Sequence, residues 1–331
     1  MGAWVGTEVG LSFLNYRFTP RDKRDDEWTL YTDTSGPLAF GIRALAMDSK
    51  GRLWIGTAGG LMVLDTRGTP TRRSDDVSIV YTSANGLAHD QVNDIIIDSA
   101  GRGWIACGSY LQGGLNVVDI GTSLTSRGDD IWATFATTNS GLPDPYVTSV
   151  ALDSNVLAWL GTQNGAAVLN YGGTPFNRND DVWTVFNTSN SGLAYNAVRD
   201  IVVDAASNTW FALALEGVST RAGNGLWVTF KQADGLASNA TDSVMVDRGG
   251  YVWIGTDGGG VSALNYNASL SNKADDAWVT YSTGNGALAS TSVTVLMQDR
   301  WGQIWVGTFG GGASIYSGVS FKQNSLPMIR R

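Results

Sequence analysis

A tryptophan, usually followed by an apolar residue, Gly and Thr, recurs along the chain about once every 50 residues. A period of this length is typical of one four-stranded blade of a β-propeller. The repeat constrains the fold more than the length of 331 residues, which alone would suggest two domains. The seven marker tryptophans are Trp4, Trp54, Trp104, Trp159, Trp210, Trp253 and Trp305.

The residues before each marker predict how one unit folds. An aspartate stands six residues ahead of each of the last six markers and ends a short apolar run such as VNDIIID. Such β-branched runs are typical of a strand covered on both faces. We expect each aspartate to bond its own backbone two residues on and so turn the chain into the tryptophan strand. Stretches such as GLMVLD and VSIVYT then supply a third and a fourth antiparallel strand.

Seven such units predict an all-β fold, a seven-bladed propeller of four-stranded antiparallel blades, because a closed ring removes exposed sheet edges. The first blade is expected to be incomplete, since only three residues precede Trp4. We expect the C-terminal end of the chain to complete it. The predicted blades span residues 1–35 (completed by 322–331), 36–85, 86–139, 140–190, 191–233, 234–285 and 286–321.

The marker triplets have a structural interpretation. We expect each tryptophan to fill the space between neighbouring blades, the glycine to allow close approach of the next chain segment, and the threonine hydroxyl to bond locally. Trp301, inside a turn, is the tryptophan expected to be exposed.

Composition excludes several classes of partner. The formal net charge of −8 argues against nucleic acid, whose binding is driven by basic residues. No apolar stretch is long enough to cross a bilayer, so membrane insertion by this segment is not expected. The N-terminus lacks the pattern of a signal peptide. A single cysteine, Cys107, excludes an internal disulfide.

The segment GIRALAMDSKGRLWIGTAGGLMVLD, residues 41–65, resembles the two-component regulator propeller repeat. Proteins of that family form tandem seven-bladed propellers in the periplasmic sensor regions of hybrid histidine kinases, several of which respond to oligosaccharides. The resemblance therefore implies an extracytoplasmic (periplasmic or secreted) sensing or recognition module. This chain departs from the full sensor in having no immunoglobulin-like connector, membrane helix or kinase.

A second recurrent feature is a paired aspartate in the long link between the third and fourth strands of five units, such as Asp75-Asp76, with a base two residues before it. We interpret each as an aspartate-anchored turn with a local ion pair. Structural calcium is the alternative, since it prefers oxygen ligands. No other cofactor is expected.

Ligand binding is expected on the opposite face, where the link between blades and the link from second to third strand meet near the central channel. Tyr110 lies in one of these links, and Asp242 is expected just inside the channel. Aromatic, amide and charged side chains in these links suit an oligosaccharide. The candidate ligand-binding residues are Phe40, Arg43, His89, Asp90, Tyr146, Tyr195, Asn196, Arg199, Glu216, Asn239, Asp257 and Phe309.

No catalytic or metal-binding motif is found, so we predict a non-enzymatic sensor for a small molecule such as a glycan. A lyase that uses His89 as a base, with nearby carboxylates, is one alternative. The other is a protein-interaction or architectural propeller without a small-molecule site.

Overall fold

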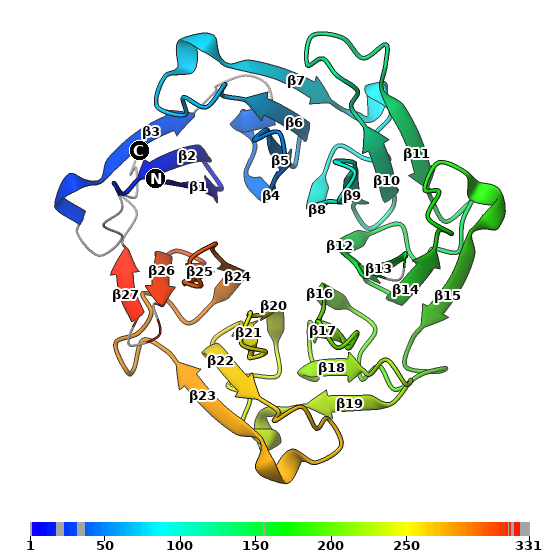
Figure 1. Cartoon of the computed structure of the whole chain (residues 1–331). Coiled ribbons are helices and arrows are strands. Elements are labelled where there is room, and N and C mark those ends of the chain that lie inside the picture. The colour runs from blue at the N-terminus through cyan, green and yellow to red at the C-terminus, as the bar shows by residue number, and fades with distance from the viewer. Residues whose placement is uncertain are drawn as a thin grey trace. The chain divides into compact units, whose positions relative to one another are not determined.

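Antiparallel strands make up nearly all the regular structure of the computed structural model, which describes residues 2–17, 23–31, 37–154, 156–316, 318 and 321–324. The strands form seven separate sheets, and the fold is a seven-bladed β-propeller (Figure 1). By the contacts among its residues the chain divides into two compact units, Met1–Leu160 with Ala167–Thr184, and Gly161–Ala166 with Val185–Arg331.

The first four sheets follow one another along the chain, and all but the first have four strands. Their strands are β1 (Gly2–Thr7), β2 (Gly10–Asn15) and β3 (Glu27–Tyr31); β4 (Ile42–Met47), β5 (Leu53–Thr57), β6 (Gly60–Asp65) and β7 (Val77–Tyr81); β8 (Val92–Ile97), β9 (Gly103–Gly108), β10 (Gly113–Asp119) and β11 (Ile131–Phe135); and β12 (Val147–Leu152), β13 (Leu157–Thr162), β14 (Gly165–Asn170) and β15 (Val182–Phe186).

The last three sheets each have four strands. Their strands are β16 (Val198–Val203), β17 (Thr209–Leu213), β18 (Val218–Arg221) and β19 (Trp227–Phe230); β20 (Thr241–Val246), β21 (Val252–Thr256), β22 (Gly260–Asn265) and β23 (Ala277–Tyr281); and β24 (Val293–Gln298), β25 (Ile304–Thr308), β26 (Gly312–Tyr316) and β27 (Phe321–Asn324).

Short 3-10 helices of three residues each lie in the links. They are η1 (Lys23–Asp25), η2 (Pro37–Ala39), η3 (Arg73–Asp75), η4 (Ser83–Asn85), η5 (Arg178–Asp180), η6 (Gln232–Asp234) and η7 (Lys273–Asp275).

The C-terminal strand differs from the sequence prediction. The prediction assigned residues 322–331 to the first blade, whereas β27 pairs antiparallel with β26 and is the fourth strand of the seventh sheet. Gly318, with φ +86°, lies between β26 and β27, where the chain reverses as it does after the other third strands. Residues 325–331 lie outside the described residues.

Each turn between the first and second strands is held by the predicted aspartate. The Asp48 Oδ1 accepts the backbone N–H groups of Lys50 and Arg52, both at 2.9 Å. Its Oδ2 accepts the indole N–H of Trp54 at 3.2 Å, a contact the sequence did not predict. The same bond from indole to aspartate occurs in the sheets of Trp104, Trp210, Trp253 and Trp305, at 2.9–3.1 Å.

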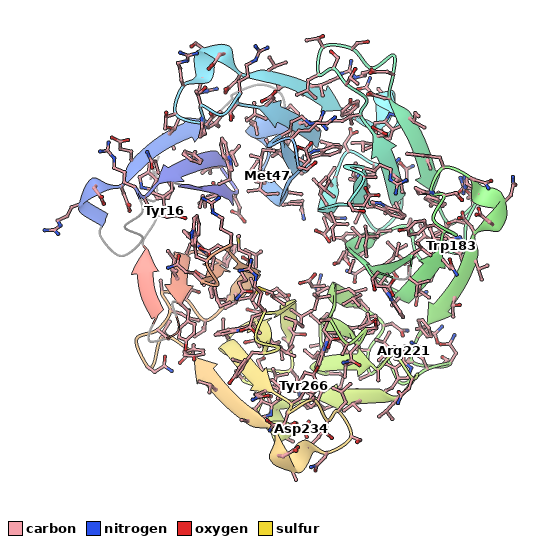
Figure 2. All side chains as sticks on the ribbon, in the orientation of Figure 1. Tyr16, Met47, Trp183, Arg221, Asp234 and Tyr266 are labelled. Carbon is pink, nitrogen blue, oxygen red and sulfur yellow. The ribbon has the colours of Figure 1, made fainter. Side chains whose placement is uncertain are left out.

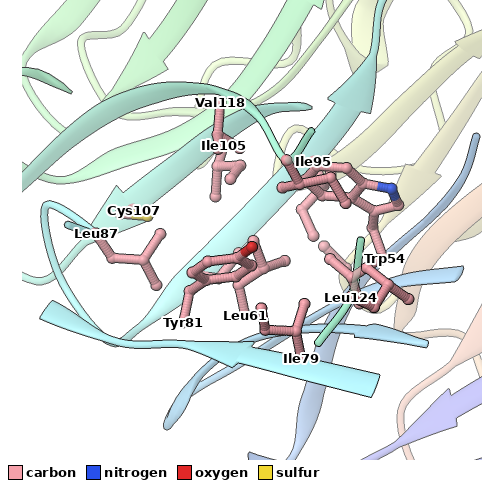
Figure 3. Close-up of a cluster of buried hydrophobic side chains, with 14 residues drawn as sticks. Trp54, Leu61, Ile79, Tyr81, Leu87, Ile95, Ile105, Cys107, Val118 and Leu124 are labelled. Carbon is pink, nitrogen blue, oxygen red and sulfur yellow. The ribbon is translucent and has the colours of Figure 1, made fainter. Parts of the chain in front are cut away.

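The marker tryptophan packs between two blades. Trp54 is fully buried in a cluster that includes residues of the second and third sheets (Figure 3). A side chain added at Gly103 on β9 would collide with the Trp54 ring. A Cβ at Gly56 would lie 2.6 Å from the Val92 side chain of β8. The glycines therefore allow neighbouring sheets to approach closely, as predicted.

The threonine of the triplet also behaves as predicted. The Thr57 hydroxyl donates to the Gly60 carbonyl at 2.9 Å and accepts the Gly59 N–H at 3.0 Å. These bonds close the turn that leads to the third strand, so the turn has a fixed shape before any ligand binds.

Candidate ligand-binding face

The turns between second and third strands are hydrogen-bonded to the links between blades. The Gly108 N–H donates to the Gln91 carbonyl at 2.9 Å within the third blade. The Gly217 N–H donates to the Asn239 carbonyl of the following blade at 2.8 Å. Because backbone bonds join the two kinds of loop, they form one preorganised surface at that end of each unit.

In the first compact unit (Met1–Leu160 with Ala167–Thr184), two tyrosines from different loops lie in contact on this surface. Tyr110 lies in the turn between β9 and β10, and Tyr146 lies in the link before β12. Their ring centroids are 5.2 Å apart in an edge-on arrangement. Tyr110 is 75% exposed and the adjacent Leu111 is 88% exposed. We call Tyr110 and Tyr146 the tyrosine platform.

His89 lies beside this platform. Its Nδ1 accepts the Gln91 N–H at 2.9 Å, and its Nε2 is 3.5 Å from the Ser109 hydroxyl. The bond at Nδ1 assigns the proton of the neutral ring to Nε2. Nε2 is therefore a donor toward the surface rather than an acceptor, which suits binding a hydroxyl oxygen and does not suit a general base.

Three of the candidate residues shape the links in which they lie. The Asp90 Oδ1 accepts the Ser83 N–H at 2.5 Å. The Asn196 Oδ1 accepts the Thr188 N–H at 2.9 Å, and the Asn239 Oδ1 accepts the Gln232 N–H at 2.8 Å. Each side chain thus joins the two ends of its own link, a use that the sequence did not predict.

The two remaining candidates of the first unit have different surroundings. Phe40 is 49% exposed and lies against Gly59, where an added side chain would collide with its ring. Arg43, on β4, is exposed. Phe40 belongs to the loop surface, whereas Arg43 lies on the first strand of its blade.

The second compact unit contains a cluster of charged side chains. Burial raises the pKa of Asp242 on β20; the Arg199 charge on β16 opposes this rise and Asp257 adds to it. These three side chains therefore lie within electrostatic reach of one another. Arg199 and Asp257 are exposed. The cluster combines donors and acceptors that could bind polar groups of a ligand.

The other candidates of the second unit are spread over its loops. Glu216 adopts φ +74° and forms an exposed ion pair with Lys231 at 2.5 Å. Tyr195 is half-buried, and Phe309 is 63% exposed. The structure brings none of these three into a described contact with Arg199.

Two aspartates that the sequence analysis did not select join first strands of neighbouring blades. The Asp94 Oδ2 accepts the Val150 N–H at 2.9 Å, and the Asp200 Oδ2 accepts the Val244 N–H at 2.9 Å. Burial raises the pKa of Asp94, although its hydrogen bonds oppose the shift. The local feature that marks the position of Asp94 is a bulge in β8 between Val92 and Asp94, and the sequence does not reveal this bulge.

The paired-aspartate links are built differently from the local ion pair predicted for them. In the four links whose base the structure describes, that base reaches the preceding blade: the Arg127 guanidinium lies 5.4 Å from the Tyr81 ring centroid. Lys273 lies 4.9 Å from the Phe230 ring centroid and pairs with Asp234, labelled in Figure 2, at 2.9 Å. The charges of Arg127 and Lys273 nevertheless oppose the rise in pKa that burial causes at Asp130 and Asp276, so the local counter-charge predicted for these links is present without a direct ion pair.

The aspartates of these links differ in their partners. The first residue of a pair accepts from its own loop, as Asp129 does from the Thr122 hydroxyl at 3.1 Å. The second residue, Asp130, accepts the Tyr81 hydroxyl at 2.8 Å. The carboxylate oxygens of Asp276 are buried without a hydrogen-bond partner, because Phe230 replaces the tyrosine there. Calcium binding at these links stays a prediction.

Within the described ranges, no group of three or more His, Cys, Asp and Glu side chains is placed to hold a metal ion. Burial raises the pKa of the Cys107 thiol to about 12. The thiol is therefore protonated at neutral pH and unsuited to nucleophilic attack.

The repeat itself matches a known family. The family model described as two component regulator propeller matches residues 41–59 and 287–310, in the second and seventh blades. The chain contains two-component regulator propeller repeats. No sequence among curated proteins matches the chain.

Solved structures show how widely this chain shares its fold. Virginiamycin B lyase from Staphylococcus aureus, solved as a catalytically inactive variant with quinupristin, is 14% identical with a TM-score of 0.65. The match covers 93% of this chain and 87% of the lyase chain. PorZ from Porphyromonas gingivalis, a surface component of the type-IX secretion system, is 17% identical with a TM-score of 0.59. There, 98% of this chain covers 49% of that protein.

The extracellular domain of the hybrid two-component system BT4673 from B. thetaiotaomicron is 18% identical with a TM-score of 0.50. This chain spans about half of that domain: the match covers 98% of this chain and 47% of that one. At these identities the likeness extends to the fold alone. Among the described residues, no helix has the length and hydropathy of a membrane span.

Proposed function

We propose that this propeller is a non-enzymatic, extracytoplasmic recognition module that binds an oligosaccharide on the loop surface of its first unit. The observation that carries the proposal is the tyrosine platform. Tyr110 is 75% exposed, and its contact with Tyr146 orients it. An exposed, oriented aromatic ring provides the flat apolar surface on which the C–H face of a sugar packs.

Polar groups suited to sugar hydroxyls lie next to the platform. The His89 Nε2 is a donor, and the Ser109 hydroxyl 3.5 Å away can donate or accept. Backbone bonds fix the loops that position both residues, such as that from the Ser109 N–H to the Gln112 carbonyl at 2.8 Å. A preformed site loses less conformational entropy on binding, which favours affinity for a polar ligand.

Two features support recognition without catalysis. The Nδ1 bond to the Gln91 N–H leaves the outward nitrogen of His89 protonated, so it cannot take a proton from a substrate. The family of the repeat is that of two-component regulators, which also supports the extracytoplasmic location.

A glycan array followed by isothermal titration calorimetry on the full chain tests this proposal. Tyr110→Ala should weaken binding of the best saccharide about tenfold or more, since an aromatic contact contributes on the order of 1 kcal/mol beyond its buried area. Ile131→Ala is the control, because Ile131 is a 52% exposed apolar side chain on β11, outside the loop surface. Equal affinity of the two variants, or no saccharide bound by a folded chain, would exclude the platform as a glycan site.

Protein interaction is the second candidate function. Leu111 is 88% exposed and Val9, in the corresponding turn of the first blade, is 70% exposed. Exposed aliphatic side chains on these turns favour a protein partner over a sugar. This candidate gains support if Leu111→Ser abolishes capture of a partner while the glycan array remains negative.

A further inference from the structure

A second surface, at the other end of the strands, departs from the repeat in the last two blades. It lies on the turns between β20 and β21 and between β24 and β25. We call Arg248, Tyr251, Arg300 and Trp301 the arginine–tryptophan patch. Tyr251 is 43% exposed, Trp301 is 46% exposed, and both arginines are exposed.

The arginines of the patch differ from those in the same turns of earlier blades. Arg52 pairs with the aspartate of its own turn at 2.6 Å, and Arg102 does so at the same distance. In the last two blades Tyr251 and Gln303 occupy that position, and the arginine follows the aspartate directly instead. Within the described residues, neither Arg248 nor Arg300 forms an ion pair with a carboxylate. Their charge is therefore available to a partner.

The patch is held in shape by contacts between the two turns. The Arg248 N–H donates to the Gln298 Oε1 at 3.0 Å, and its guanidinium donates to the Arg300 carbonyl at 2.9 Å. The Arg300 guanidinium lies 4.1 Å from the centroid of the Trp301 ring. A guanidinium stacked on an indole keeps its N–H edge directed away from the ring, where it can bind a carboxylate with two hydrogen bonds.

The chemistry of the patch selects an anionic ligand. Asp247 and Asp299, the carboxylates of these turns, accept the indoles of Trp253 and Trp305 at 2.9 and 3.1 Å. The patch therefore offers donors and aromatic faces but few acceptors for hydroxyl groups. A patch of positive charge on a chain of net charge −8 is complementary to acidic groups.

From these observations we propose that the arginine–tryptophan patch binds an acidic segment of a protein partner, with its carboxylates on Arg248 and Arg300 and an apolar side chain on Trp301. Arg, Trp and Tyr are the residues that contribute most binding energy in protein interfaces. This binding is separate from the proposed glycan site and does not depend on it.

Fluorescence anisotropy with the full chain tests the proposal. The probe is a labelled peptide of alternating glutamate and tyrosine, and the control probe replaces each glutamate by glutamine. The acidic peptide should bind, and added salt should weaken it. Arg248→Gln combined with Arg300→Gln should weaken binding about tenfold or more, since both charged donors to the carboxylates are removed.

Matched variants separate the patch from general charge effects. Lys50→Gln combined with Arg67→Gln removes two exposed positive charges elsewhere and should leave peptide affinity unchanged. Trp301→Ala should weaken the acidic peptide without altering the thermal midpoint of the fold. The proposal is overturned if the acidic peptide does not bind, if the glutamine peptide binds equally, or if the arginine variant keeps full affinity. Tighter binding of polygalacturonate than of the peptide, lost in the same variant, would also overturn it and assign the patch to an anionic polysaccharide.

Discussion

At the scale of single residues, one aspartate in five of the blades bonds both its own turn and the marker tryptophan. The Asp48 Oδ1 bonds the turn and its Oδ2 bonds both the Arg52 guanidinium, at 2.6 Å, and the Trp54 indole. Asp204 has the same bonds to its turn and to Trp210, but its neighbour is the neutral Asn208, at 2.9 Å. The two blades therefore offer a comparison of a charged and a neutral version of one site.

We predict that Asp48→Asn lowers the free energy of unfolding more than Asp204→Asn does. Asn at position 48 leaves the buried Arg52 charge uncompensated, at a cost of about 3–5 kcal/mol. Asn at position 204 loses hydrogen bonds but no ion pair, at a cost of about 1–2 kcal/mol. Denaturant unfolding of both variants measures the difference, and equal losses would show that the Arg52 ion pair contributes nothing.

The same residue predicts a pH dependence. Burial works to raise the pKa of Asp48, but hydrogen bonds from Arg52 and Trp54 outweigh it and lower the pKa. A carboxyl whose pKa is lower in the folded state stabilises the fold above its unfolded pKa of about 3.9. That stability is lost as pH falls through the folded pKa. The difference between the parent chain and Asp48→Asn should therefore shrink below about pH 3.9.

At the scale of elements, the fourth strand of one blade is joined to the long link of the next. Tyr81, at the end of β7, is buried and donates to Asp130 at 2.8 Å while Arg127 lies on its ring. Phe230, at the end of β19, occupies the equivalent place opposite Asp276, whose carboxylate oxygens are buried without a partner. One hydroxyl group thus separates a junction whose aspartate has a donor on one oxygen from a junction whose aspartate has none on either.

Exchanging the two aromatic residues tests this difference. Tyr81→Phe should lower the free energy of unfolding by about 1–2 kcal/mol, because it leaves a buried carboxylate oxygen without its donor. Phe230→Tyr should raise it by about 1 kcal/mol by supplying the missing donor to Asp276. Thermal unfolding of both variants provides the measurement; destabilisation by Phe230→Tyr would show that Asp276 has no room for the hydroxyl.

The elements also show what sequence alone could predict. The roles of the recurring residues were predicted correctly. Gly56 allows the next sheet to approach and Thr57 closes its turn, and the pattern within a single repeat already indicates both roles. The reach of Arg127 to the preceding blade was missed, because the spacing within one link says nothing about the residues of another. The first blade was correctly expected to be incomplete, but the pairing of the final strand depended on a choice between two sheets.

The candidate site was harder to predict for the same reason. Asp90, Asn196 and Asn239 were chosen as polar residues in variable links, yet their side chains bond the backbone of those links. The contact between Tyr110 and Tyr146 joins loops of two different blades, so neither loop alone signals it. Residue type indicated which loops to consider as a ligand-binding surface, which stays a prediction, whereas the individual contacts required the structure.

At the scale of the whole molecule, the blades and the loops have separate tasks. The repeated Asp, Trp, Gly and Thr residues build the sheets and their junctions, and they leave the loop residues free to differ from blade to blade. The differences are concentrated in two places, the tyrosine platform of the first unit and the arginine–tryptophan patch of the second. A repeat fold can in this way present distinct binding surfaces without changing its core.

Hydrogen–deuterium exchange of the full chain, with and without the saccharide selected on the glycan array, tests the central claim that recognition occurs on the loop surface of the first unit. We predict slower exchange confined to the segments around residues 108–112 and 142–147, with the strands and the turns of residues 247–251 unchanged. Protection elsewhere on the chain, or none with any saccharide, would contradict the claim.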